Sequence, residues 1–129
     1  MAYEYNIETR TFPAGADLSS NQFYYVTLNA SAQVIVCTAA TDIPIGVLQN
    51  KPDAAGKAAS VAMGGTTKVI CAGAVAIGDL IGTDAAGKAD PKIPGTDTTE
   101  YLVGIALETG AADEIIAATI STYAPARAA

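Results

Sequence analysis

One pattern constrains the fold of this 129-residue chain more than any other: a short apolar run with a glycine at its centre, written twice. The first copy is Ile43–Leu48 and the second is Tyr101–Leu107, with Gly46 and Gly104 near their midpoints. Runs of this length, rich in Val, Ile and Leu, are typical of buried strands. A glycine inside a strand usually marks a bend, a bulge or a close backbone approach. The chain therefore contains one core strand in duplicate.

The elements around each glycine-centred run repeat in the same order. A strand–turn–strand hairpin precedes the run, at Val26–Val34 and again at Ile81–Ala89, and a small turn and a closing strand follow it. The closing strands are Ala58–Met63 and Ile115–Ile120. Two copies, roughly 55 to 60 residues apart, are too few and too widely spaced for a solenoid. We expect an all-β fold, a small single-domain β-barrel or β-sandwich built from two related hairpin units.

The N-terminal residues 2–12 alternate between two faces, with Tyr3, Tyr5 and Ile7 on one of them. Period-two alternation predicts a strand. Pro13 and a loop-like stretch follow, and the last residues have no periodicity. We therefore expect an extended N-terminal arm and loop over residues 1–20, an all-β domain over 21–123 and a flexible tail over 124–129. Residues 2–12 could dock on another molecule or complete the domain's own sheet.

Aromatic side chains are concentrated at the N-terminal end, where six of the eight lie within the first 25 residues. Tyrosine and phenylalanine supply contact area at protein interfaces, whereas Ala, Val and Ile fill compact interiors. This end of the chain is therefore expected to touch other molecules. The candidate partner-binding residues are Tyr3, Tyr5, Ile7 and Phe12, and the candidate oligomer or surface contacts are Phe23 and Tyr25.

Composition argues against several classes of function. The net charge is −6, and the seven basic residues are scattered, so binding to nucleic acid is not expected. No apolar stretch approaches the length that spans a membrane, and no membrane partner is expected. Histidine is absent, and the two cysteines, Cys37 and Cys71, lie in separate β-prone runs. We expect them to be small buried hydrophobes, bridged or not, and we expect no metal or other cofactor.

Catalytic motifs are weak in this sequence. Residues 82–89 match the glycine and lysine spacing of a phosphate-binding loop, but Ala89 stands where a Ser or Thr would bind magnesium. The last six of these residues, Asp-Ala-Ala-Gly-Lys-Ala, recur from Asp53 onward, where no glycine stands at the first position of the motif. This recurrence indicates a turn. The acids that could pair in a catalytic dyad are Asp79, Asp84, Asp90 and Asp97. Each lies within two residues of a Gly, Ala or Pro, where short acids cap turns. We do not expect an enzyme, and a carboxylate-dependent hydrolase is the least favoured hypothesis.

The order of elements resembles the family of tailed-bacteriophage capsid decoration (cement, or head-stabilising) proteins. The resemblance covers roughly residues 20–122. Its motifs are short, and their order carries more weight than any one match. The residues that carry it are Gly78–Ile81 leading into Asp84–Ala89, Tyr101–Glu108 closing on Ile115–Ile120, and, in the first half, Ile45–Leu48 and Val69–Gly73.

This resemblance implies a structural virion protein, made in the host cytoplasm, that sits on the outer surface of a phage capsid. Such a protein would bind the major capsid protein, commonly as a homotrimer, and clamp neighbouring capsid subunits. The alternative is a virion surface module that binds carbohydrate or a host surface. That alternative requires a patch of exposed aromatic side chains, and the only candidate is the cluster Phe23, Tyr24 and Tyr25.

Overall fold

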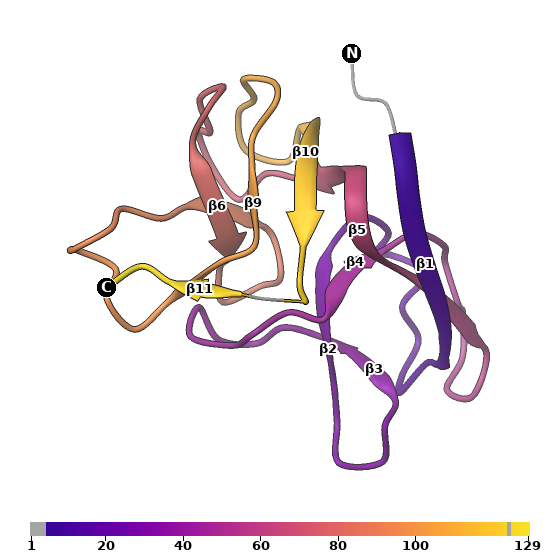
Figure 1. Cartoon of the computed structure of the whole chain (residues 1–129). Helices are drawn as coiled ribbons and strands as arrows, with labels where there is room; N and C mark the ends of the chain where they lie inside the picture. Colours follow the sequence, from indigo (N-terminus) through magenta and orange to yellow (C-terminus); the bar gives the residue numbers. More distant parts are fainter. Residues whose placement is uncertain (1–4, 124) are drawn as a thin grey trace.

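The computed structural model describes residues 5–123 and 125–129, and every regular element within them is a strand (Figure 1). No helix long and apolar enough to cross a membrane occurs in these residues. The all-β prediction is confirmed, but the sheets do not close into a barrel. The strands are β1 Tyr5–Pro13, β2 Tyr25–Leu28, β3 Val34–Val36, β4 Gly46–Leu48, β5 Ala58–Ile70, β6 Leu80–Thr83, β7 Ala89–Pro91, β8 Tyr101–Leu102, β9 Gly104–Ile105, β10 Ile115–Ser121 and β11 Ala126–Arg127.

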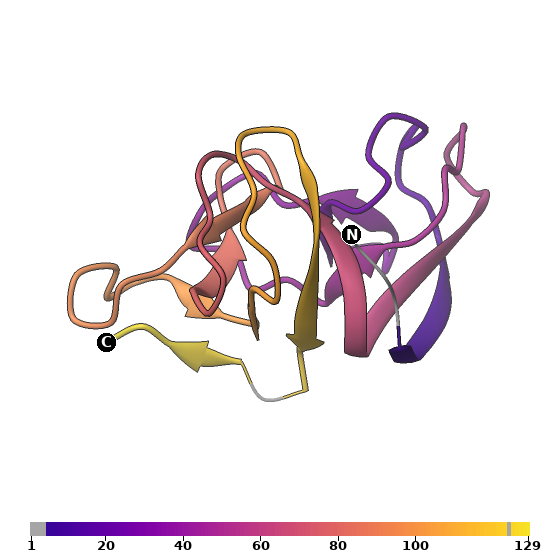
Figure 2. The same cartoon turned by 90° about the horizontal axis from the view of Figure 1, so that it is seen from above.

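The long strand β5 organises the molecule. Its first half pairs antiparallel with β1 and β4, and its second half pairs antiparallel with β10. Gly64 and Gly65, which in the sequence look like a break between two strands, instead lie inside this 13-residue strand. Gly65 has a φ of +97°, and β5 bends sharply along its length (Figure 1). The bend lets one strand serve both halves of the molecule, which lie side by side when viewed from above (Figure 2).

The β2–β3 and β6–β7 hairpins close with the same type of turn. Asn29, after β2, accepts hydrogen bonds through its side-chain Oδ1 from the backbone amides of Ser31 and Gln33, at 2.9 and 3.0 Å. Asp84, after β6, accepts the same two bonds from the amides two and four residues later, both at 2.8 Å. Short polar side chains cap turns in this way. Residues 84–88 therefore form the turn of the β6–β7 hairpin, and Ala89, the last residue of the predicted turn, begins β7.

The two central glycines also occupy equivalent places. A Cβ on Gly46 would lie closer than 3.0 Å to the carbonyl oxygen of Ala62 on β5. A Cβ on Gly104 would lie equally close to the carbonyl oxygen of Thr119 on β10. In each repeat, the neighbouring strand crosses where only a residue without a side chain fits. The predicted close backbone approach is confirmed at both sites.

The repeat begins earlier than the sequence indicates, at β1. Ala14, after β1, donates its amide to the carbonyl of Lys57 at 2.8 Å, and Cys71, after β5, donates to Glu114 at 2.9 Å. Ala14 and Cys71 also form parallel bridges to the second strand of their hairpins, β3 and β7. β1 therefore occupies the same position in the first repeat that the second half of β5 occupies in the second repeat. The predicted boundary between an arm over 1–20 and a domain from 21 is revised, because β1 is the first strand of the domain's own sheet.

The C-terminal end packs against the fold. β11 pairs antiparallel with β8. Ala128 is buried, its amide donates to the Glu100 carbonyl at 2.9 Å, and its carbonyl accepts from the Gly95 amide at 2.9 Å. The tail predicted over 124–129 is therefore part of the structure from residue 126 onward.

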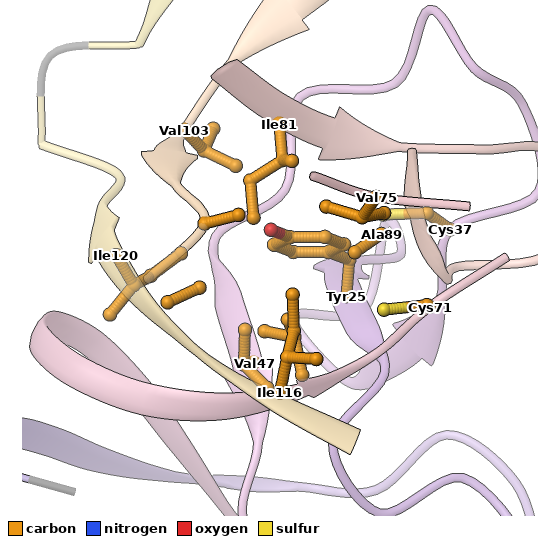
Figure 3. Packing of buried hydrophobic residues seen from close by; sticks show 13 residues of the cluster. Tyr25, Cys37, Val47, Cys71, Val75, Ile81, Ala89, Val103, Ile116 and Ile120 are labelled. Atoms are coloured by element: carbon orange, nitrogen blue, oxygen red, sulfur yellow. The ribbon is translucent and has the colours of Figure 1, made fainter. Parts of the chain in front are cut away.

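Two apolar cores fill the molecule. The smaller core belongs to the first repeat and contains Ala14, Leu18, Val26, Val34, Leu48, Ala59 and Val61. The larger core lies mainly in the second repeat, but Tyr25 from β2, Cys37 and Val47 from β4 also enter it (Figure 3). Tyr25 is 1% exposed. The prediction of a surface contact is wrong for Tyr25, because its ring fills the space between the two repeats. Cys37 and Cys71 are buried free thiols, and burial raises the pKa of Cys37 to about 12.

The Tyr25 hydroxyl is buried and has no hydrogen-bond partner among the residues that the structure describes. Replacing Tyr25 with phenylalanine should raise the free energy of unfolding by about 1–2 kcal/mol, because burying an unpartnered hydroxyl among apolar side chains costs about that much. Urea denaturation of the Tyr25→Phe variant measures the change. Tyr24→Phe is the control and should shift the midpoint little, because Tyr24 is only half-buried. A loss of stability in Tyr25→Phe would contradict the prediction.

Candidate functional site

Most of the carboxylates that could have formed a catalytic site bind backbone amides instead, whereas Asp90 lies 3.2 Å from the Lys92 ammonium and caps no turn. Asp79 accepts a hydrogen bond from the amide of Ala76 at 2.9 Å, and Asp97 accepts one from the amide of Ile93 at 2.6 Å. Both acids cap turns, as Asp84 does. In the part of the chain that the structure describes, no pocket opens and no three metal-ligating side chains come together. The features that remain for binding lie on the outer surface.

The outer edge of β1 is the longest unpaired strand edge in the described residues, since β1 ends the six-stranded sheet. Ser60 on β5 accepts from the Gln49 amide and donates its amide to the Asn50 side chain, so its polar backbone groups point toward β4. Its partner across the β1–β5 pair is Thr11. In an antiparallel pair such residues both turn their N–H and C=O away from the other strand. Thr11, and likewise Thr9, therefore present these groups at the open edge.

The predicted partner-binding residues lie along this strand with different surroundings. Tyr3 lies outside the described residues. Tyr5 begins β1, where its backbone is opposite Thr66, and Ile7 is half-buried. Phe12 is half-buried and packs against the smaller core, so it anchors the strand to the domain.

The aromatic cluster near residue 24 does not form an exposed platform. Tyr25 is buried, while the Lys68 ammonium lies 5.6 Å from the centre of the Phe23 ring. Lys88 lies 5.8 Å from the centre of the Tyr24 ring. Each lysine can make a cation–π contact with its ring. The patch required by the carbohydrate-binding alternative is therefore absent from this cluster, and Phe23 keeps only partial exposure.

Charged residues on β1 are a feature that the sequence reasoning did not select. Glu8 and Arg10 are exposed and stand two residues apart. Tyr123, which follows β10, hydrogen-bonds to Glu8, and this bond raises the pKa of the tyrosine. The Tyr123 ring lies next to Gly64, where a Cβ would be 3.6 Å from its Cε2 atom. The alternating pattern of the strand places Glu8 and Arg10 on one face, and no other feature of the sequence points to these two residues.

Comparison with known proteins places this fold in a family. A family model described as "Phage cement protein" matches residues 5–120. The chain belongs to the phage cement proteins. The match begins with β1 and ends within β10, so it covers both repeats of this cement protein. It is therefore a structural protein associated with a phage capsid.

A solved structure supports the fold of the cement protein independently. This chain is similar to the solved structure of the head fiber gp8.5 N base in bacteriophage phi29, with a TM-score of 0.62 and 19% sequence identity. The similarity covers 90% of this chain and 95% of that chain. At this identity the likeness concerns the fold alone. No curated protein sequence matches the cement protein.

Proposed function

We propose that this cement protein binds the outer surface of a phage capsid and stabilises it by clamping neighbouring copies of the major capsid protein. The observation that carries the proposal is the family match across both repeats. The architecture is compatible with such a role, because two apolar cores joined by one strand, β5, make a stiff body. A clamp requires stiffness and contact area, and it requires no catalytic chemistry.

We propose the N-terminal segment as the capsid contact, through Tyr3, Tyr5 and Ile7. The sequence places these three on one face by alternation. Phe12 holds the following strand to the smaller core, so the segment would start from a fixed base. Aromatic residues at the margin of a rigid domain suit a contact that many copies share across a lattice, where weak contacts gain from multivalency.

We further propose that the protein acts as a trimer, the assembly that its resemblance to decoration proteins implies. Phe23 is the remaining aromatic candidate for a contact between protomers. Sedimentation equilibrium of the purified chain tests this part, because a mass three times that of the chain is expected. A strict monomer at all concentrations would contradict it.

Binding to purified, expanded capsids that lack the protein tests the main proposal. Wild-type protein should occupy the capsids and raise the temperature at which they release DNA. Removing residues 2–4 should reduce occupancy at least about tenfold, which corresponds to the loss of about 1.4 kcal/mol of binding free energy. This truncation leaves β1 complete, whereas removing residues 2–12 would also remove Phe12 from the core.

Ile93→Ser is the matched control, because it removes an exposed apolar side chain from the loop after β7 and should leave occupancy unchanged. Unchanged occupancy after removal of residues 2–4 would reject the N-terminal contact. Failure of the wild-type protein to bind any capsid would reject the proposed function itself.

A further inference from the structure

We infer that the open edge of β1 pairs antiparallel with β1 of a second copy of this chain, about a two-fold axis through Thr9. This contact is separate from the proposed binding of Tyr3, Tyr5 and Ile7 to the capsid, because it uses the strand edge and the charged residues. It would join one copy to its neighbour and make a continuous sheet through both.

The edge is suited to adding a strand. β1 is nine residues long, and its pairing with β5 shifts register between Tyr5 and Thr9 but is regular from Thr9 to Pro13. In this regular part, Thr9 and Thr11 turn their N–H and C=O groups outward. Pro13 follows the same alternation, so its missing N–H falls on the outward side and removes no bond to β5. An antiparallel partner could therefore bond to Thr9 through a reciprocal pair of backbone hydrogen bonds.

The sequence of β1 selects a second copy as the partner. When two β1 strands run antiparallel with Thr9 opposite Thr9, Glu8 of each copy faces Arg10 of the other. Opposite charges placed directly across a strand pair are stabilising, and so are Thr–Thr pairs. Two copies of β1 in this register are therefore complementary in charge.

Other registers lose this match. Centring the pair on Arg10 brings the two arginines opposite each other, and centring it on Glu8 brings the two glutamates together, and like charges directly opposite are destabilising. Centring it on Thr11 leaves both charges without a charged partner. If one β1 strand slid by a single residue, residues whose backbone N–H and C=O groups point outward would face residues whose groups point toward β5.

The side chains that would meet reach solvent, and Glu8 would share or exchange its contact with Tyr123 on meeting Arg10 of the other copy. Glu8 and Arg10 are exposed, and the β5 residue opposite Glu8 is Gly64, which has no side chain to compete. The Glu8 carboxylate lies over the sheet, since a Cβ on Gly64 would be 3.9 Å from Glu8 Oε2 and 3.6 Å from Tyr123 Cε2. Glu8 and Arg10 both act on Tyr123, so the two charges lie on one face. Exposed charge pairs are individually weak, so the contact should be weak between free molecules and stronger where copies are held close together on a surface.

A disulfide trap tests the two-fold axis directly in the full-length chain. With Thr9→Cys, the two thiols would face each other at a Cα separation of about 5.5 Å, within the range that a disulfide spans. With Thr11→Cys, the thiols would be about 13 Å apart along the strands and could not join. The native cysteines are buried and should not interfere. Under mild oxidation, non-reducing denaturing gels should show covalent dimer forming about tenfold faster for Thr9→Cys than for Thr11→Cys.

Charge exchange provides the second test. Glu8→Arg and Arg10→Glu, each in the Thr9→Cys background, should slow cross-linking severalfold, and the two changes together should restore it. Circular dichroism confirms that each variant is folded. Equal rates for the two cysteine variants, no dimer from either, or no recovery in the double exchange would overturn the inference. None of these measurements uses a capsid, so failure here leaves the proposed function standing, and failure of capsid binding leaves this contact standing.

Discussion

Gly104→Ala should lower the free energy of unfolding by about 3 kcal/mol or more, because overpacking a close backbone contact costs at the upper end of the usual range. A Cβ at this position would meet the carbonyl oxygen of Thr119, and backbone cannot move aside as a flexible side chain can. The two strands that would have to separate, β9 and β10, close the second repeat. Urea denaturation, followed by circular dichroism, measures the loss.

Gly73→Ala is the matched control, because nothing lies within 4 Å of the added methyl group and Gly73 has no positive φ. It should change stability little. Gly46→Ala should resemble Gly104→Ala, since its Cβ would meet the carbonyl oxygen of Ala62 in the same way. If Gly104→Ala were as stable as Gly73→Ala, the close backbone contact at Gly104 would not matter for stability, and the prediction would be wrong.

Glu100→Gln should destabilise the protein by about 2 kcal/mol, through loss of a buried ion pair. The side chain of Lys92 is fully buried, and its ammonium lies 2.6 Å from Glu100 Oε1 and 3.2 Å from Asp90 Oδ2. Removing the nearer carboxylate leaves a buried positive charge with only one charged partner among the described residues. The shift in the urea midpoint, at constant slope, measures this effect.

Asp90→Asn is the comparison, since Asp90 is 43% exposed and Glu100 only 19%. Water screens the more exposed carboxylate, so Asp90→Asn should cost less than about 1 kcal/mol. Equal losses for the two variants, or a smaller loss for Glu100→Gln, would show that burial does not govern the strength of this cluster.

The sequence allowed the all-β class, the duplication and the turn chemistry to be predicted, because each has a local signal. Gly46 and Gly104 stand out inside apolar runs, and the hexapeptide at Asp84 has the acid and glycine that its turn uses. The limits of strands were predicted less well. The run Tyr101–Leu107 became two short strands, β8 and β9, because β8 pairs with β11 and β9 with β6.

The features that were missed depend on contacts between distant segments. β1 and the second half of β5 are equivalent in their hydrogen bonds, but one carries Glu8 and the other Gly65 at comparable places, so their sequences do not reveal the relation. Tyr25 was predicted at the surface because tyrosine is common at interfaces, and only the packing of the second repeat shows that its ring is enclosed. Ala128 has no pattern to predict its burial.

The sharing of β5 between both repeats has a mechanical consequence. A force that pulls the two halves of the molecule apart would act along the covalent backbone of a single strand, and not only across weak side-chain packing between separate lobes. Within β5, residues 58–66 pair with β1, residues 61 and 62 with β4, and residues 64–70 with β10. Extension must therefore shear several rows of hydrogen bonds at once. Resistance to tension is thus built into the connectivity of the chain.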